Sequence, residues 1–264
     1  MSIRVLLNGA AGKMGLAMAA FILADPGFEL AAGVDIAAAG RDVGELATGK
    51  KCGVLIENEL AKAIDKAKPD VMLDFTDPDT VGEGVRTALS KGLDCVVGTT
   101  GLTDAELEEA DALARQVGAG LIVAPNFALS AVLMTRFARE AAQYFPDYEL
   151  VETHHDKKKD APSGTALAMV RAIGDVRAPH RQGRADAYEE VAGCRGGDYE
   201  GARIHSVRLP GVVARHEITF GGPGQLLTIR QECTSRQCFW PGVRLALLRV
   251  GEVKGLVYGL DEII

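Results

Sequence analysis

The densest group of reactive side chains lies at residues 152–166, which read ETHHDKKKDAPSGTA. Two adjacent histidines, His154 and His155, precede a lysine run that includes Lys158. A histidine can transfer a proton near neutral pH, and a lysine adds a full positive charge. Ser163 is a favourable helix N-cap, so the backbone N–H groups after it would be free to bind a carboxylate. We expect an anion site at which a proton is transferred.

A solvated lysine run beside two surface histidines is the alternative interpretation, and the capped helix that follows favours the anion site. A metal centre is not predicted, because neighbouring residues of a strand point to opposite faces, which keeps His154 and His155 from chelating one ion. The five cysteines and five histidines also lack the clustered spacing of a zinc site. Around Ser163 the chain reads PSG, without the nucleophile elbow of serine hydrolases.

A second motif is the run GAAGKMG at residues 9–15, whose glycines have the spacing G-x-x-G-x-x-G. It stands between a predicted strand and a predicted helix, where small residues let the backbone approach a pyrophosphate. Asp35 follows Gly15 by 20 residues, as does a carboxylate that binds an adenosine ribose. A glycine-rich turn needed only for packing is the alternative, and Met14 after Lys13 excludes a Walker A loop. The predicted dinucleotide-binding residues are Gly9, Ala10, Ala11, Gly12, Lys13, Met14 and Asp35.

The residues around Asp35 bear on the choice of cofactor. Asp35 would accept hydrogen bonds from the ribose hydroxyls and repel a 2′-phosphate, and Ile36 offers that phosphate no charge. We therefore favour NADH, with NADPH as the alternative through Lys13. Two further loops are expected to line the nicotinamide side, or else to be simple turns. They contain Gly98, Thr99, Thr100 and Gly101, and Ala124, Pro125, Asn126 and Phe127.

The first half of the chain alternates short apolar runs with helical periodicity. Strands are predicted at residues 4–7, 28–34, 71–75, 94–97 and 121–123, and helices at 13–24, 80–90 and 103–117. A capping box of Thr103 and Glu106 opens the last of these helices. Buried strands that alternate with helices predict an α/β fold with a Rossmann-like, doubly wound parallel sheet.

The second half predicts an α+β domain with a mostly antiparallel open sheet. Helices are expected at residues 127–144 and 163–173, with a strand at 148–153 between them. Alternating segments at 204–209, 212–220 and 226–232, with turns at 210–211 and 221–224, indicate an antiparallel meander. A helix at 241–249 and a strand at 255–260 end the chain. We expect a dinucleotide-binding domain of residues 1–126 and 239–264, and a substrate-binding and oligomerisation domain of residues 127–238.

Composition excludes several classes of protein. The 264 residues are 47% apolar and 25% charged, which is too apolar for a disordered chain, and no apolar run is long enough for a membrane span. A net charge of −7 disfavours generic binding of nucleic acid. No signal peptide is recognised at the start, and an odd number of cysteines without a C-x-x-C motif indicates free thiols in a reducing cytoplasm.

The motifs together resemble the 4-hydroxy-tetrahydrodipicolinate reductase (dihydrodipicolinate reductase) family. The most specific likeness is the series of two histidines, Lys158 and the run DAPSGTA at residues 160–166. The other landmarks agree in order and spacing over nearly the whole chain. They are the glycine loop, DFT at residues 74–76, VGTTG at 97–101, APNF at 124–127, and Ser235, Arg236 and Phe239.

The resemblance implies NAD(P)H-dependent reduction of a cyclic unsaturated dicarboxylate in the diaminopimelate and lysine pathway. It gives His154 the role of proton donor and acceptor and Lys158 that of catalytic lysine. His155, Ser163, Gly164 and Thr165 are implied at the substrate carboxylates. Many members carry Arg where this chain has Ile36, a departure that bears on the use of NADPH. The family also implies a homotetramer built through the C-terminal sheet.

With this reaction, the substrate would bind between two domains, and we expect closure about hinges near Phe127 and Phe239. One alternative is another two-domain NAD(P)-dependent oxidoreductase that acts on a small carboxylate. It would share the glycine loop but has no reason to carry the two histidines with the Ser-Gly-Thr run. A redox-sensing regulator without turnover is a further alternative, and it would usually carry a basic DNA-binding segment, which the sequence lacks.

Overall fold

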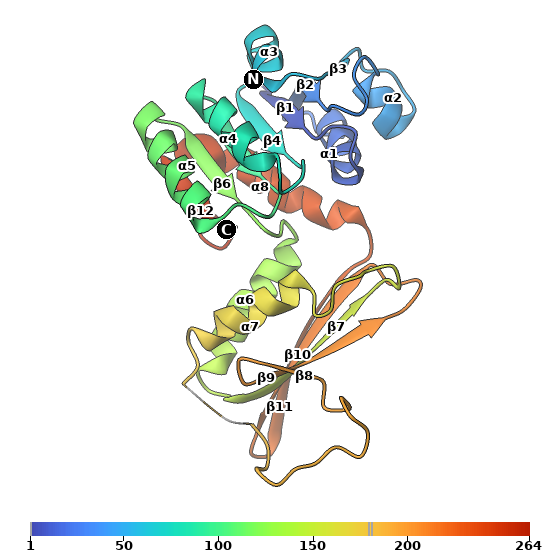
Figure 1. Cartoon of the computed structure of the whole chain (residues 1–264), viewed down its shortest axis with the longest axis vertical. Coiled ribbons are helices and arrows are strands. Elements are labelled where there is room, and N and C mark those ends of the chain that lie inside the picture. Colours follow the sequence, from blue (N-terminus) through green and yellow to red (C-terminus); the bar gives the residue numbers. More distant parts are fainter. Residues whose placement is uncertain (1, 179, 181) are drawn as a thin grey trace. The chain divides into compact units, whose positions relative to one another are not determined.

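The computed structural model describes residues 2–178, 180 and 182–264. The chain forms two compact units (Figure 1). The first unit comprises the residues up to Phe127 together with Phe239–Ile264, and the second unit comprises Ala128–Cys238. The C-terminal segment therefore returns to the unit that contains the N-terminal strands.

The first unit is built on a seven-stranded sheet whose paired strands all run parallel. The strand order is β12-β6-β5-β4-β1-β2-β3, so the chain moves outward from β1 in both directions. This order confirms the predicted doubly wound sheet, and its switch point lies between β1 and β4. The strands are β1 (Ile3–Asn8), β2 (Phe28–Val34), β3 (Ile56–Glu57), β4 (Val71–Asp74), β5 (Asp94–Val97), β6 (Gly120–Val123) and β12 (Gly255–Tyr258).

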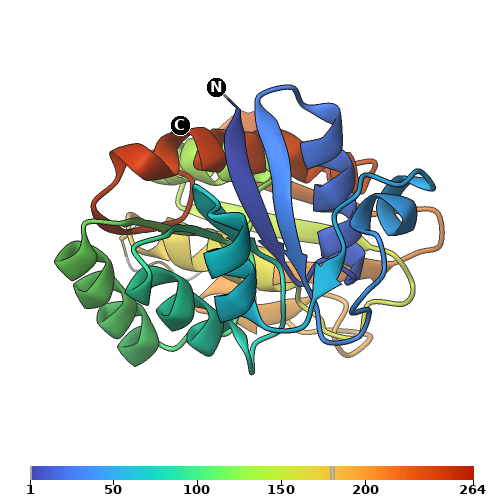
Figure 2. The same cartoon turned by 90° about the horizontal axis from the view of Figure 1, so that it is seen from above.

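Helices cover both faces of this sheet (Figure 2). On one face, α3 (Leu60–Ala67), α4 (Val81–Ser90) and α5 (Asp104–Val117) bury Ile64, Leu89 and Ala114 against the strands. On the other, α1 (Lys13–Ala24) meets α8 (Trp240–Arg249), and the rings of Phe21 and Trp240 lie 5.7 Å apart. The remaining short elements are α2 (Val43–Thr48) and the 3₁₀ turns η1 (Arg236–Phe239) and η2 (Val250–Glu252).

Local sequence signals explain most of these boundaries. The predicted capping box is confirmed, because the Thr103 hydroxyl accepts from the Glu106 N–H while the Glu106 carboxylate accepts from the Thr103 N–H. The segment after Asp35 contains α2, β3 and α3, none of which was predicted. Short α2 and β3 give little periodicity, but apolar residues in α3 recur at Leu60, Ala63, Ile64 and Ala67, the spacing of one helix face.

The second unit is a five-stranded sheet in the order β11-β10-β7-β9-β8. Its elements are α6 (Leu129–Ala142), β7 (Asp147–His154), α7 (Gly164–Gly174), β8 (Gly197–Tyr199), β9 (Ala202–Arg208), β10 (Ala214–Gly222) and β11 (Gln225–Cys233). All neighbours are antiparallel except β7 and β9. Helix α6 packs against α7, β10 and β11. Within the described residues, no helix is both long and apolar enough to cross a membrane.

The predicted meander is wrong in one respect. Strands β9 and β10 are consecutive in sequence, yet they lie on opposite sides of β7 rather than beside each other. The reason is the long connection through α7, which lets the chain return so that β9 runs parallel to β7. Strand β7 is thereby central, with β9 on one side and β10 on the other.

Candidate active site

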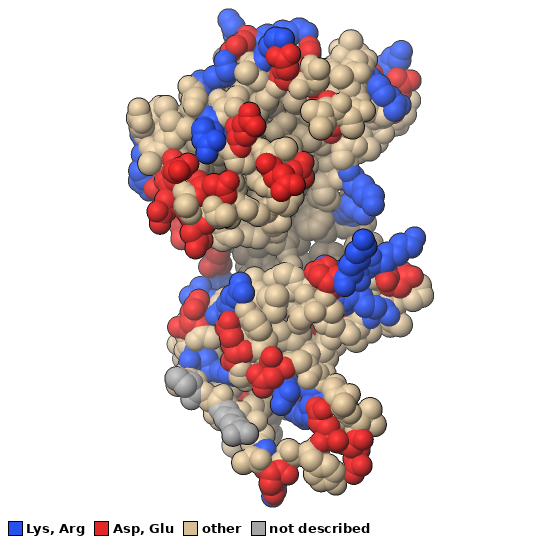
Figure 3. All heavy atoms as spheres, viewed as in Figure 1, with Lys and Arg blue, Asp and Glu red and all other residues tan. Residues whose placement is uncertain are grey.

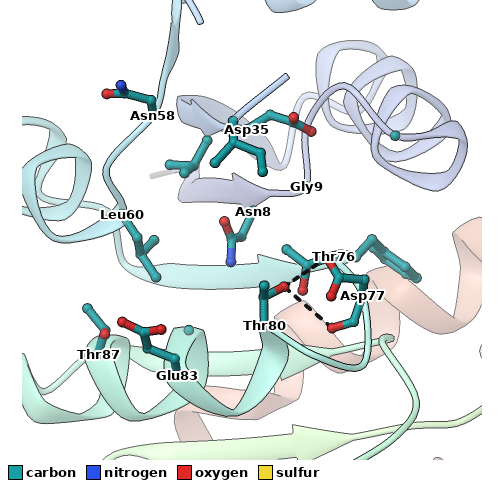
Figure 4. Close-up of a pocket in the computed structure, with 15 residues that line it drawn as sticks. Asn8, Gly9, Asp35, Asn58, Leu60, Thr76, Asp77, Thr80, Glu83 and Thr87 are labelled. Carbon is teal, nitrogen blue, oxygen red and sulfur yellow. Dashed lines mark hydrogen bonds between the residues drawn. The ribbon is translucent and has the colours of Figure 1, made fainter. Parts of the chain in front are cut away.

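The first unit has a cleft of about 410 Å³ at its topological switch point (Figure 4). Figure 4 shows Asn8 at the end of β1 and Glu83 on α4 on opposite walls, with Asn58 and Leu60 at one end. The lining residues are Asn8, Gly9, Gly12, Val34, Asp35, Ile36, Asn58, Leu60, Phe75, Thr76, Asp77, Thr80, Glu83, Gly84 and Thr87. The carboxyl ends of parallel strands at a switch point are the usual place for a nucleotide.

The three glycines of the loop have different physical roles. A Cβ added to Gly9, whose φ is +80°, would lie 2.3 Å from the Phe75 carbonyl oxygen. A Cβ added to Gly15 would lie 1.9 Å from the Gly9 carbonyl oxygen, so packing alone requires both of these glycines. At Gly12 the nearest atom would be 3.4 Å away, and Gly12 lines the cleft. The chain leaves room for a side chain at Gly12, so packing within the protein does not by itself require this glycine.

The Asp35 carboxylate is held beside this loop. One oxygen accepts the Ala11 N–H at 2.9 Å, and the other accepts the Ala37 N–H at 2.8 Å. Ile36 is 87% exposed, and its apolar side chain places no positive charge beside the Asp35 carboxylate. Of the predicted dinucleotide residues, Gly9, Gly12 and Asp35 line the cleft, whereas Ala10 is fully buried beneath it.

A buried carboxylate of the DFT motif holds residues that line the cleft, among them Asn8 and Thr76. Asp74 is fully buried, and one of its oxygens accepts from Asn8 Nδ2 at 2.7 Å. The other accepts from Thr99 Oγ1 at 2.6 Å and Thr76 Oγ1 at 2.8 Å. Asp74 therefore ties the ends of β1 and β4 to the loop after β5. The motif DFT contains it, but the sequence shows no local sign of partners so distant along the chain.

The two loops predicted for the nicotinamide side follow β5 and β6. Gly98 packs so closely that an added Cβ would lie 2.2 Å from the Phe75 ring, while the Ala124 N–H donates to the Val97 carbonyl at 2.9 Å. Phe127 is buried, with its ring 5.9 Å from that of Phe75. These neighbouring strand ends bring the two loops to one edge of the sheet, but neither loop lines the cleft of Figure 4.

In the second unit, His154 ends β7 and is fixed by charged neighbours. Its Nδ1 is hydrogen-bonded to the carboxylate of Glu152, which is fully buried. Arg208 on β9 donates to both oxygens of the same carboxylate, at 2.8 and 3.0 Å. Burial opposes ionisation of Glu152, but hydrogen bonds from His154, Arg208 and Ser206 outweigh it and lower its pKa to about 2.

The loop between β7 and α7 carries the lysine run, and Figure 3 shows basic side chains with acidic ones among them where this loop lies. Lys158 Nζ lies 2.8 Å from both carboxylate oxygens of Asp160. Arg208 donates to the Asp160 carbonyl at 2.6 Å, which ties the loop to β9. His155 is exposed at the start of the loop, and Lys158 is only partly exposed.

The start of α7 confirms Ser163 as its N-cap, since its hydroxyl oxygen accepts the Ala166 N–H at 3.2 Å. A Cβ added to Gly164 would have no atom within 4 Å, so this helix start is open. His216 on β10 places Nε2 3.3 Å from Ser163 Oγ, and its ring lies 5.4 Å from the His154 ring. Burial, helped by the positive charges of His154 and Lys158, lowers the pKa of His216 to about 4.

The second unit thus brings a histidine, a lysine and an open helix N-terminus together around His216. Three residues of this cluster were not predicted as site residues: Glu152, Arg208 and His216. Glu152 lay in the predicted segment, but nothing in the sequence indicates that strand pairing places the other two beside it. No group of three or more possible metal ligands occurs among the described residues.

Comparison with known proteins gives full-length matches. The model for the N-terminus of dihydrodipicolinate reductase matches residues 3–127, and that for its C-terminus matches residues 130–264. The 4-hydroxy-tetrahydrodipicolinate reductase of Desulfitobacterium hafniense is 46% identical over 261 residues, which cover 98% of each chain. That of Moorella thermoacetica is also 46% identical, over 100% of this chain and 98% of its own.

Solved structures agree with these matches. Dipicolinate-bound dihydrodipicolinate reductase from Paenisporosarcina sp. TG-14 has a TM-score of 0.90 and 43% identity, with all of both chains covered. An amine dehydrogenase from Mycobacterium smegmatis has a TM-score of 0.68 over 97% of this chain and 95% of its own, but only 16% identity. The second likeness shows a shared fold alone.

Proposed function

The chain belongs to the dihydrodipicolinate reductase family, and from that premise we propose that it reduces 4-hydroxy-tetrahydrodipicolinate to tetrahydrodipicolinate. It is an NAD(P)H-dependent oxidoreductase of diaminopimelate and lysine biosynthesis. The observation that carries the proposal is the cluster of His154, Lys158 and the open start of α7, which suits an anionic substrate that must gain a proton.

We assign the cofactor to the first unit. The residues present fit a dinucleotide, because Gly12 leaves space in the cleft and Asp35 is held for hydrogen bonds to a ribose. When bound, the reduced nicotinamide supplies the hydride. The proposed cofactor residues are Gly9, Ala10, Ala11, Gly12, Lys13, Met14, Asp35, Gly98, Thr99, Thr100, Ala124, Pro125, Asn126 and Phe127.

NADH is the cofactor that we favour over NADPH. The Asp35 carboxylate repels a 2′-phosphate, and the exposed Ile36 cannot neutralise one. Lys13 begins α1 beside the same loop and is the residue through which NADPH would be accepted. Comparison of kcat/KM for the two cofactors tests this preference directly.

We assign the substrate carboxylates to the start of α7. Ser163 presents a hydroxyl, and Gly164 and Thr165 present first-turn backbone N–H groups, where the helix dipole favours negative charge. Lys158 adds a positive charge, and His155 stands exposed at the beginning of the same loop. A small dicarboxylate such as dipicolinate has the charge that this site would attract.

His154 is the proposed proton donor. Glu152 is ionised and can only accept, so the proton on Nδ1 of His154 points to Glu152. The ring donates in its doubly protonated form, in which Nε2 carries the proton that is transferred. Hydride addition leaves negative charge on the conjugated substrate, which a proton from Nε2 would neutralise. General acid catalysis of this kind contributes about 10²–10⁴ in rate. Lys158 stabilises the same charge and assists the transfer.

We also propose a homotetramer in the cytoplasm. Strand β11 is an edge of the second sheet, and its Leu226 is 77% exposed, so a second copy of the chain would bury apolar surface there. All five cysteines are free, which suits a reducing compartment. Light scattering of the purified protein measures the oligomer.

The test of the activity uses freshly condensed pyruvate and aspartate semialdehyde as substrate. Purified protein is added with NADH or NADPH, and loss of the reduced-nicotinamide absorbance is followed. Oxidation that requires the condensed substrate is expected, and no oxidation with either cofactor would refute the function. His154→Gln and Lys158→Met should lower kcat while affinity for the cofactor changes little, since both residues lie in the second unit.

A further inference from the structure

A chain of hydrogen bonds runs from the surface of the second unit to the buried Ser163. Ser130 Oγ on α6 donates to Gln231 Oε1 at 3.1 Å, and Gln231 Nε2 lies 2.7 Å from His216 Nδ1. His216 Nε2 in turn lies 3.3 Å from Ser163 Oγ. Gln231, His216 and Ser163 are all less than 8% exposed. Water therefore does not compete for the bonds that join these three side chains, and their direction is set by the groups themselves.

The direction of the chain follows from the chemistry of its members. An amide NH₂ can only donate, so Gln231 donates to Nδ1 of His216, and the Cys233 thiol at 3.7 Å from Oε1 supports the same orientation of the amide. The imidazole is neutral, because burial and the nearby positive charges lower its pKa to about 4. A neutral imidazole that accepts at Nδ1 carries its proton on Nε2, and His216 therefore donates to Ser163.

This direction determines what the Ser163 hydroxyl can do. Its oxygen accepts the Ala166 N–H at 3.2 Å as well as the His216 N–H, so both acceptor positions are filled. Only the hydroxyl proton remains to be donated, and Ser163 stands directly before the open helix start at Gly164. We propose that His216 and Gln231 are positioning residues that hold Ser163 as a hydrogen-bond donor to a substrate carboxylate. The proposal rests on the function given above.

Two substitutions of His216 separate its two nitrogens. His216→Asn retains an amide near the position of Nδ1 and removes the donor at Nε2 from Ser163, whereas His216→Gln extends an amide to the position of Nε2. Dipicolinate is titrated into each variant by calorimetry in the presence of NADH, and steady-state kinetics are measured alongside. We expect His216→Asn to weaken dipicolinate binding and raise KM by about tenfold with kcat changed less than twofold, while His216→Gln stays within about threefold of the original protein.

Coupling to Ser163 is the readout that a merely structural role would not give. In a Ser163→Ala background, His216→Asn should weaken dipicolinate binding no further, because His216 acts through the missing hydroxyl. Gln231→Met should behave as His216→Asn does in both backgrounds. Circular dichroism confirms that each variant is folded before it is titrated.

Three results would overturn the positioning role: equal losses from His216→Asn with and without Ser163, a fall in kcat rather than a rise in KM, or no binding of dipicolinate to the original protein. Failure of the proposed function has a different signature. In that case the original protein would not oxidise NADH or NADPH with the condensed substrate, whatever the titrations show.

Discussion

Acid should destabilise the second unit through His216. The ring is 2% exposed and its pKa is lowered from 6.5 to about 4, mainly by burial and further by the charges of His154 and Lys158. Between these two values the unfolded chain binds a proton at this position and the folded chain does not. Stability therefore rises with pH over this window. Above pH 6.5 His216 is neutral in both states and does not lower the free energy of unfolding. As the pH falls toward 4, protonation of the unfolded chain lowers that free energy progressively.

The size of the effect follows from the shift. One unit of pKa corresponds to about 1.4 kcal/mol, so the full linkage is about 3 kcal/mol. Most of this loss in the free energy of unfolding occurs at pH values where the folded ring is still neutral. Between about pH 7 and pH 5, protonation of the unfolded chain alone should lower the free energy of unfolding by about 2 kcal/mol.

The assay is urea unfolding followed by circular dichroism at several pH values in this range and at one protein concentration. His216→Gln is the matched control, because it retains a buried amide but cannot titrate. Glu152, the other histidines and the surface carboxylates are common to both proteins, so the difference between their pH dependences isolates His216. We expect the original protein to lose about 2 kcal/mol more than the variant on going from about pH 7 to pH 5. Parallel losses in the two proteins would refute a buried, neutral His216.

Three further predictions concern the cleft and the histidine. Gly12→Ala should fold normally yet lose about tenfold or more in NADH affinity by fluorescence titration, whereas Gly15→Ala should lower the melting temperature, because its Cβ would meet the backbone at 1.9 Å. Glu152→Gln leaves Arg208 without its anion. We expect the free energy of unfolding to fall by about 3 kcal/mol and kcat to fall about tenfold. Unchanged thermal unfolding and unchanged kinetics would contradict this pairing. Asp35→Asn combined with Ile36→Arg should raise the ratio of kcat/KM for NADPH over NADH by about tenfold, and an unchanged ratio would show that position 35 does not contact the ribose.

Sequence reasoning was most successful where the determinant is local. Helix α1 has the predicted bounds of residues 13–24 because an apolar face follows a glycine loop, and Thr103 and Glu106 cap α5 through neighbours three residues apart. The N-cap of α7 depends in the same way on Ser163, which lies three residues before the N–H group that it accepts. Each of these features is encoded within a few residues and needs no knowledge of the tertiary fold.

The position of Arg208 beside Glu152 and His154 could not be predicted, because it depends on strand order. Arg208 is 54 residues from His154 in sequence and stands opposite it only because β9 pairs parallel with β7. The predicted meander placed β9 beside β10 and did not identify β7 as the strand that lies between them. The partners of Asp74 could not be predicted for a similar reason, since Asn8 and Thr99 follow or end other strands.

The central position of β7 has a consequence for how this family can change over time. His154 pairs with Arg208 in β9 and with Ala214 in β10, and Glu152 pairs with His216, so the cluster is defined by the register of three strands. A single inserted or deleted residue within any of them would turn alternate side chains to the opposite face of the sheet. Changes of length should therefore accumulate in the connecting loops, such as residues 209–213, while these three strands keep their spacing.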